Sequence, residues 1–293
     1  MITEISVCTL VRGRRAQLAN LITGLNRQSV RPSELVIAYM QDAPHEALPE
    51  TPFPVKSLKV PGAKLPLAAA RNRAAMVANG RVLVFLDVDC IPGPDLVRAY
   101  AQAVAETGGC VMGEARYLGA DAPIGEDGSF RFADLWGAAA RHPARLDGEA
   151  IERERLPLPM MDANELWGLT FALPKLQFLR VGGFDEGFVG YGAEETDFAR
   201  ALAENDVPLH FEPRAQAVHQ WHAVHQPPLQ HFDDIVANAR RYHAKRGQWP
   251  MDYWLQQFEA DGFIRRGRDI HVLRRPGKED MARAERAGDV RFS

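Results

Sequence analysis

Short apolar runs alternate with amphipathic segments along the first third of the chain. Four runs of the kind that strands favour lie at residues 5–10, 35–39, 55–60 and 82–86. Apolar residues from Leu18 to Leu25 recur at helical spacing, and the Ala-rich stretch 67–78 predicts a second helix that ends at Asn79-Gly80. Strands alternating with helices predict an α/β fold, with a central mixed but mostly parallel sheet flanked by helices.

The pattern changes after about Val111. Further strands are predicted at 111–117, 169–173 and 217–221, and helices at 175–181 and 194–205. From His231 onward the chain reads as helical and rich in aromatic residues, which predicts a helical extension that packs through them. From about Arg265 it becomes highly charged, and we expect a solvated, partly mobile tail that includes the arginine clusters at 265–268 and 274–275.

Composition narrows the class of protein. The net charge of -3 gives no electrostatic case for binding nucleic acid. The three cysteines are odd in number and widely spaced, which predicts neither a disulfide framework nor a CxxC metal site and fits a reducing cytosol. No apolar run approaches the length of a membrane span, and no signal-peptide pattern precedes the first strand. We expect a cytoplasmic protein without an integral membrane segment, and leave peripheral contact with the inner face of the membrane open.

Asp87-Val88-Asp89 is the most informative motif, and it follows the apolar run 82–86 directly. Ligands of parallel α/β sheets bind at the carboxyl ends of strands, so both carboxylates can reach the mouth of a cleft. Carboxylate oxygens suit Mg²⁺ or Mn²⁺. The motif therefore predicts a site for a divalent cation that carries a phosphate. The alternative is a solvated strand end.

A second motif combines glycines with acids. Gly182-Gly183-Phe184-Asp185-Glu186 is followed by a Gly-rich turn and then by Glu194-Glu195-Thr196-Asp197 at the start of the predicted helix 194–205. Glycine lets a backbone approach a ligand closely, and a carboxylate in the first helical turn is favoured in its ionised form by the helix dipole. Such a carboxylate can act as a general base, or it can merely cap the helix.

Histidines and arginines supply two further candidates. His219-Gln220-Trp221-His222 offers one metal ligand, although an extended segment would place the two imidazoles on opposite faces. A zinc site that also uses His225 is disfavoured, because no HExxH pattern or thiolate pair accompanies it. In Ala70-Arg71-Asn72-Arg73-Ala74, an arginine could pair with phosphate, or the segment could be a solvated helix face.

Other familiar motifs are missing from the sequence. It contains no GxGxxG after a strand, no GxxxxGK[ST] and no GxSxG. These absences argue against hydride transfer, P-loop phosphoryl transfer and serine hydrolysis.

Taken in order, these segments resemble the family 2 glycosyltransferases of the GT-A fold, from about Ile5 to about His222. The segment Tyr191-Gly192-Ala193-Glu194-Glu195 also looks like the Trp-Gly-Gly-Glu-Asp pattern of galactosyltransferases, with Tyr, Ala and Glu as replacements. The resemblance implies an inverting enzyme that moves a sugar from a nucleotide diphosphate, most simply a UDP-sugar, to an acceptor hydroxyl. Mn²⁺ or Mg²⁺ would assist.

The resemblance also implies roles for individual residues. Glu195 would be the catalytic base. The nucleotide-sugar would contact Thr9, Arg12, Asp42, Arg71 and Asp87. The donor or acceptor sugar would contact Trp167, Gly183, Asp185 and Glu194. The metal ligands would be Asp89 with His219 or His222.

The implied organisation is a GT-A catalytic domain at 1–225, divided into a nucleotide-binding half (1–110) and an acceptor-binding half (111–225). Residues 226–293 would form the helical extension and charged tail. The acceptor would be a glycan, a lipid-linked molecule or a small molecule, and the chain could form a homodimer.

Two alternatives remain. A sugar-phosphate nucleotidyltransferase would also use acids and a cation, but it usually has a Gly-rich phosphate loop where Val11–Arg15 holds one glycine. A non-catalytic carbohydrate- or nucleotide-binding GT-A module is the other.

Overall fold

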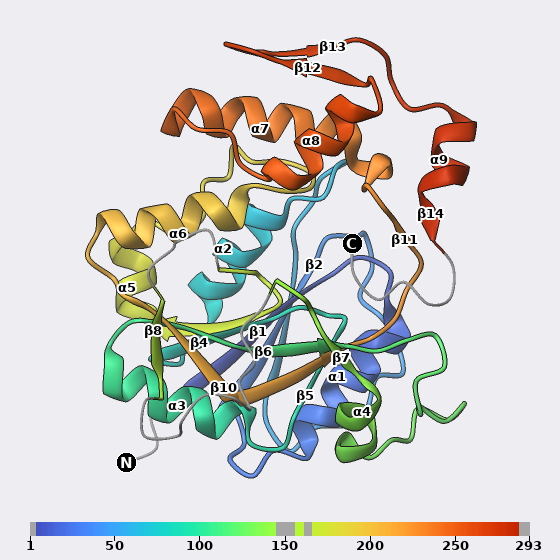
Figure 1. Ribbon diagram of the computed structural model, residues 1–293. Helices are drawn as coiled ribbons and strands as arrows, with labels where there is room; N and C mark the ends of the chain where they lie inside the picture. Colours follow the sequence, from blue (N-terminus) through green and yellow to red (C-terminus); the bar gives the residue numbers. More distant parts are fainter. Residues whose placement is uncertain (1–3, 145–155, 161–165, 287–293) are drawn as a thin grey trace.

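One mixed sheet runs through the larger, N-terminal part of the molecule (Figure 1). The computed structural model describes residues 4–144, 156–160 and 166–286. The main path of the sheet follows the order β3 (Val55–Lys59), β2 (Glu34–Tyr39), β1 (Ile5–Val11), β4 (Val82–Leu86), β9 (Thr170–Pro174), β6 (Cys110–Tyr117), β10 (Leu209–His219) and β5 (Cys90–Pro92). Two short strands flank it, β7 (Ala140–Arg141) beside β6 and β8 (Leu158–Met160) beside β10.

The directions of the strands determine which strand ends lie at the same edge of the sheet. The strands β3, β2, β1 and β4 are parallel, so their carboxyl ends lie at one edge of the sheet. The pairs β4–β9 and β6–β9 are antiparallel, and β6–β10 is parallel. At the far end of the order, β10 runs antiparallel to β5 and sets His219 opposite Cys90. This last pairing brings the end of β10 to the turn that follows β4.

Helices cover both faces of the sheet. Neighbouring residues of a strand point to opposite faces, and Val7 and Cys8 of β1 accordingly enter two different apolar cores. One core packs against α1 (Arg15–Asn26) and α3 (Leu96–Thr107), and the other against α2 (Leu67–Val77), α5 (Lys175–Arg180) and α6 (Glu194–Glu204). A short helix, α4 (Phe132–Ala138), packs on a smaller cluster with Ile91 and Val218. The predicted α/β fold is confirmed.

Helix α3 is not among the predicted elements, although its buried residues Leu96, Val97, Tyr100, Ala103 and Val104 lie on one face at helical spacing. The short strand β5 is also unpredicted, because three residues carry no periodic signal.

The C-terminal part forms its own apolar cluster from α7 (Phe232–Arg246), α8 (Asp252–Ala260) and a hairpin of β12 (Ile264–Arg266) and β13 (Ile270–Val272). A 3-10 turn (Leu229–His231) precedes α7, and α9 (Lys278–Ala284) follows the hairpin. The strand β11 (Val224–His225) pairs with β14 (Glu285–Arg286), so the last described residues lie beside the segment that follows β10. In Figure 1, α7 and α8 lie above α6 and α2.

The expectation of a solvated tail from Arg265 is wrong for the described residues. Arg266 pairs with Asp252 and Glu259, and Arg274 pairs with Asp280 while lying 4.2 Å from the Phe263 ring centroid. Each arginine cluster therefore contributes side chains to local ion pairs. No helix among the described ranges combines the length and the apolarity that a bilayer crossing requires.

Candidate active site

The turn after β4 presents the two aspartates at the carboxyl edge of the sheet. The backbone N–H of Asp87 donates to the Leu169 carbonyl at 2.8 Å, and the N–H of Asp89 donates to Asp87 Oδ1 at 2.9 Å. The Asp87 carboxylate thus shapes the turn that carries Asp89. Asp89 is buried, with 6% of its surface exposed.

Asp89, His219 and His222 form a cluster in which one ligand atom from each lies within 4.8 Å of the others. The expectation that the two imidazoles would lie on opposite faces is wrong, because β10 ends at His219 and the chain turns. The N–H of Gln220 donates to the Asp89 carbonyl at 2.6 Å, and the two rings lie with centroids 5.3 Å apart. Both histidines therefore reach the same aspartate. His225 is not part of this cluster.

Burial controls the charge of this cluster. It raises the pKa of Asp89 to about 7, with the neighbouring charge of Asp87 acting in the same direction and Arg14 opposing. Burial also lowers the pKa of His219 to about 3, aided by His222 and Arg14, and burial lowers the pKa of His222. His219 is consequently neutral near pH 7, which is the form that binds a metal.

The donor set fits a divalent cation. Asp89 Oδ1 is buried and has no hydrogen-bond partner among the described residues. An unpartnered carboxylate oxygen in a buried place is costly unless something positive binds it. Together with two imidazole nitrogens, this oxygen offers the kind of ligands that transition metals take.

Arg14 is a member of the site that was not predicted. Its Nε lies 3.4 Å from Asp89 Oδ2. His222 Nε2 lies 3.7 Å from the same oxygen, so Arg14 and His222 both approach this carboxylate. Gly13 and Arg14 both adopt the left-handed conformation, which turns the chain from β1 into α1 at the carboxyl edge. The sequence signal for it was the basic segment Arg12-Gly13-Arg14-Arg15, which comes shortly after the predicted strand 5–10.

Glu194 and Glu195, in the first turn of α6, share one arginine. Arg71 Nη1 donates to Glu194 Oε1 and its Nη2 donates to Glu195 Oε1, both at 2.9 Å. The side chains of Arg71 and Glu194 are 5% and 4% exposed, whereas that of Glu195 is 33% exposed. Glu195 is therefore the acid of this pair that a ligand can reach.

Electrostatics ties this pair to the aspartate turn. Burial would lower the pKa of Arg71, but Glu195, Glu194 and Asp87 raise it above its usual value. Burial and Glu195 raise the pKa of Glu194, against the opposing effect of Arg71. Arg71 was predicted to contact the nucleotide-sugar; in the structure both of its terminal nitrogens bind these glutamates, and a contact with a ligand stays a prediction.

Trp167 and Gly168 lie next to Glu195. A Cβ atom at Gly168 would stand 2.0 Å from Glu195 Oε1, so glycine is required for the carboxylate to approach the backbone. Trp167 and Thr170 line a small pocket with Glu114 and Phe211. Gly183 has a positive φ of 69°, and a Cβ there would stand 2.6 Å from Asn72 Oδ1.

Four other candidates are not members of the cluster, and three of them pair with protein groups while the buried Thr9 hydroxyl has no hydrogen-bond partner among the described residues. Arg12 donates to the carbonyls of Met40, Gly62, Ala63 and Lys64. The Asp42 side chain is fully exposed and lies 2.8 Å from Lys59 Nζ. Thr9 is buried in β1, and Asp185 pairs with Arg241 and Lys245 of α7. A role for these four in holding a ligand stays a prediction, and for Arg12 and Asp185 the present contacts are structural.

Comparison with known proteins identifies the family of the chain. The model for glycosyl transferase family 2 matches residues 6–188, and the model described as the N-terminal domain of galactosyltransferase matches residues 155–225. Validoxylamine A glucosyltransferases of Streptomyces hygroscopicus subsp. jinggangensis (strain 5008) and subsp. limoneus are each 30% identical over 158 residues, which is 49% of this chain. The matched segment covers 36% and 34% of those proteins, so the chain spans about a third of their length.

The fold has a solved counterpart. The crystal structure of GalNAc-T7 with UDP, GalNAc and Mn²⁺ superposes with a TM-score of 0.56 at 18% identity, over 75% of this chain and 44% of that one. This likeness supports the GT-A fold, and the family model covers well over half of the sequence. The chain therefore belongs to glycosyl transferase family 2.

Proposed function

We propose that this chain is an inverting, metal-dependent glycosyltransferase that moves a hexose from a UDP-sugar to an acceptor hydroxyl. The observation that carries the proposal is the pairing of two sites at one edge of the sheet. One is the Asp89, His219 and His222 cluster, and the other is the partly exposed Glu195 held by Arg71. Family membership supports sugar transfer, and the structural relative is described with UDP, GalNAc and Mn²⁺.

Asp89, His219 and His222 would hold the cation. A mixed carboxylate and imidazole set fits Mn²⁺ better than Mg²⁺, which prefers oxygen ligands. When bound, the cation neutralises the diphosphate and so makes it a better leaving group. Arg14 adds a second positive charge beside Asp89 and would contact the same phosphates.

Glu195 would take the proton of the acceptor hydroxyl. Inversion needs a base on the face of the sugar opposite to the leaving diphosphate. The 33% exposure of Glu195 leaves it accessible, whereas Glu194 is buried against Arg71 and has a raised pKa. Glu194 would therefore hold Arg71, and Arg71 would orient Glu195. Trp167 precedes Gly168, which lies against the Glu195 carboxylate, and Trp167 would contact the sugar there.

A two-stage experiment tests the proposal. Thermal shift with UDP, with and without Mn²⁺, should show a rise in melting temperature that depends on the metal, because a ligand that binds only the folded state stabilises it. Incubation with UDP-hexoses, UDP-glucose first because the curated relatives are named glucosyltransferases, should then release UDP in the presence of acceptor.

Three results would contradict the proposal. Turnover of a nucleoside triphosphate with a sugar phosphate would identify a nucleotidyltransferase. Binding of UDP and Mn²⁺ without any release of UDP, across donors and acceptors, would identify a non-catalytic module. A rise in melting temperature with UDP that is the same with and without Mn²⁺ would show that the metal has no part in donor binding.

A further inference from the structure

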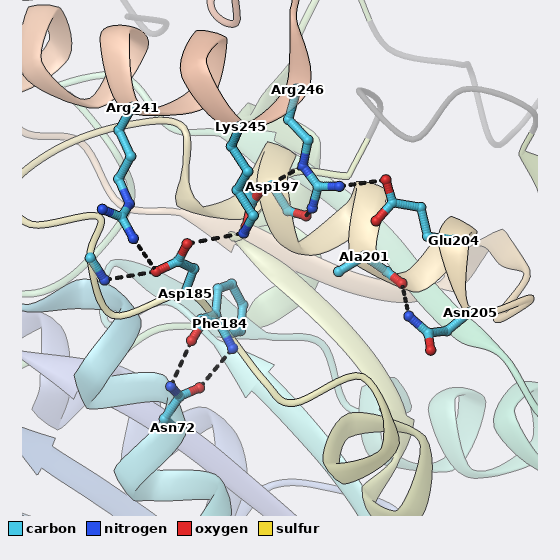
Figure 2. Close-up of polar contacts among 11 residues, drawn as sticks. Asn72, Phe184, Asp185, Asp197, Ala201, Glu204, Asn205, Arg241, Lys245 and Arg246 are labelled. Atoms are coloured by element: carbon cyan, nitrogen blue, oxygen red, sulfur yellow. Dashed lines mark hydrogen bonds and ion pairs between the residues drawn. The ribbon is translucent and has the colours of Figure 1, made fainter.

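A row of basic side chains on α7 meets the segment that leads into the acidic pair (Figure 2). Arg241 Nη2 lies 2.8 Å from Asp185 Oδ1, and Lys245 Nζ lies 3.0 Å from Asp185 Oδ2. The same Lys245 Nζ lies 2.7 Å from Asp197 Oδ2, and Arg246 Nε lies 2.8 Å from Asp197 Oδ1. Lys245 thus joins the loop before α6 to the first turn of α6.

Helix α2 holds the same segment from the other side. Asn72 Nδ2 donates to the Phe184 carbonyl at 2.8 Å, and the Phe184 N–H donates to Asn72 Oδ1 at 2.8 Å, as Figure 2 shows. The neighbouring Arg71 binds Glu194 and Glu195. Residues 184–197 are therefore held between α2, which belongs to the catalytic part, and α7, which belongs to the C-terminal part.

The contacts from α7 are shielded from water mainly at Asp197 and Arg246, whereas the Lys245 side chain is 38% exposed. The Asp197 side chain is 3% exposed, and that of Asp185 is 23% exposed. Burial alone would raise the pKa of Asp185, but hydrogen bonds from Lys245, the Gly187 backbone and Arg241 bring it down to about 2. Because the Asp197 carboxylate is buried and accepts charge-assisted hydrogen bonds from both Lys245 and Arg246, its position is restricted more than that of an exposed ion pair.

We propose that Lys245 is a positioning residue for the acidic pair. By bridging Asp185 and Asp197, it fixes the direction in which α6 leaves the Gly-rich turn, and Asp197 stands only two residues beyond Glu195. Residues 226–246 lie outside both matched family regions, which end at 188 and 225. The bridge that Lys245 makes is therefore supplied by the C-terminal part of the chain. The inference rests on the proposed function, because it assigns Glu195 as the group being aligned.

The test compares three variants. Lys245→Met removes the ammonium and keeps the side-chain length, and the fold should survive because Asp185 keeps Arg241 and Asp197 keeps Arg246. Lys245→Arg restores the charge. Arg240→Met is the matched control, since Arg240 lies on the same helix but pairs with Asp269 inside the C-terminal part.

Steady-state kinetics should separate alignment from binding. Lys245→Met should lower kcat by about 10- to 100-fold while the KM for the UDP-sugar changes by less than about twofold, because the donor binds at the β1 and β4 edge. Lys245→Arg should recover most of kcat, and Arg240→Met should match the wild type. A wild-type kcat in Lys245→Met, or an equal loss in Arg240→Met, would overturn the proposal.

Hydrogen exchange gives a readout that does not need turnover. Backbone amides from Asp197 to Ala201, the first that donate within the α6 hydrogen-bond pattern, should exchange faster in Lys245→Met than in the wild type and in Arg240→Met. Unchanged exchange would overturn the positioning role. If wild-type protein turned over no donor, the proposed function would fail, whereas faster exchange confined to Lys245→Met would still show that Lys245 holds this segment.

Discussion

Replacing Arg71 with methionine isolates the ion pair at the centre of the site. Methionine keeps much of the aliphatic length of the arginine, so the packing in the α2 core is largely retained. The guanidinium, which is bound to Glu194 and Glu195 and lies 5.1 Å from the Phe184 ring centroid, is lost. Glu194 is then a buried carboxylate without its cation.

The structure sets the size of the effect. Removing one partner of a buried ion pair costs about 3–5 kcal/mol at a pH where the remaining group is charged. The full range applies to the Arg71–Glu194 contact, because both side chains are about 5% exposed or less. The contact with the more exposed Glu195 adds little. We therefore expect the free energy of unfolding to fall by about 3–5 kcal/mol near pH 7.5.

The effect depends on pH with a definite sign. A carboxyl group whose pKa is higher in the folded than in the unfolded state contributes stability at low pH, and this stability is lost as pH rises through the folded pKa. Burial and Glu195 already raise the pKa of Glu194, and losing Arg71 raises it further. The loss in the free energy of unfolding that Arg71→Met causes should be small near pH 4.5 and should grow towards pH 7.5.

Urea unfolding followed by tryptophan fluorescence at pH 4.5 and pH 7.5 measures this difference. The double variant Arg71→Met with Glu194→Gln should recover part of the loss at pH 7.5, because the glutamine carries no charge. A deficit that is equal at both pH values, or below about 1 kcal/mol at pH 7.5, would refute the assignment of a buried, charged pair.

Three further predictions address the other parts of the site. Glu195→Gln should leave donor binding unchanged and lower kcat by about 10²–10⁴-fold, and a loss of only a few-fold with rate-limiting chemistry would move the role of base to another acid. Asp89→Asn should abolish the Mn²⁺-dependent thermal shift with UDP. The melting temperature of the free protein should not fall, because the substitution removes a buried charge beside Asp87. A retained shift would contradict the metal assignment. Truncation after Pro227 removes α7, the partner of Asp185 and Asp197, and should give insoluble or strongly destabilised protein by soluble yield and urea unfolding; a truncated chain of wild-type stability would show that the extension is an appendage.

The sequence by itself determined the elements whose signal is local. The apolar runs that become β1, β2 and β4 could be read directly, because strands buried on both faces are continuously apolar. The position of Asp87 and Asp89 at a carboxyl edge followed from the alternation of strands and helices. The acids at the start of α6 were also visible, since the helix pattern and the preceding glycines are neighbours in the chain.

Only the tertiary structure decided which distant residues meet. His219 and His222 reach Asp89 because β10 pairs antiparallel with β5 and ends at His219, a pairing that joins residues about 130 positions apart. The structure also showed that Arg71 pairs with two glutamates and that Lys245 joins Asp185 to Asp197. Hydrophobic periodicity reports whether a residue is buried and on which face, but it carries no information about the element that packs against that face. The partners of a charged side chain are set by that packing, and so they became known only from the folded chain.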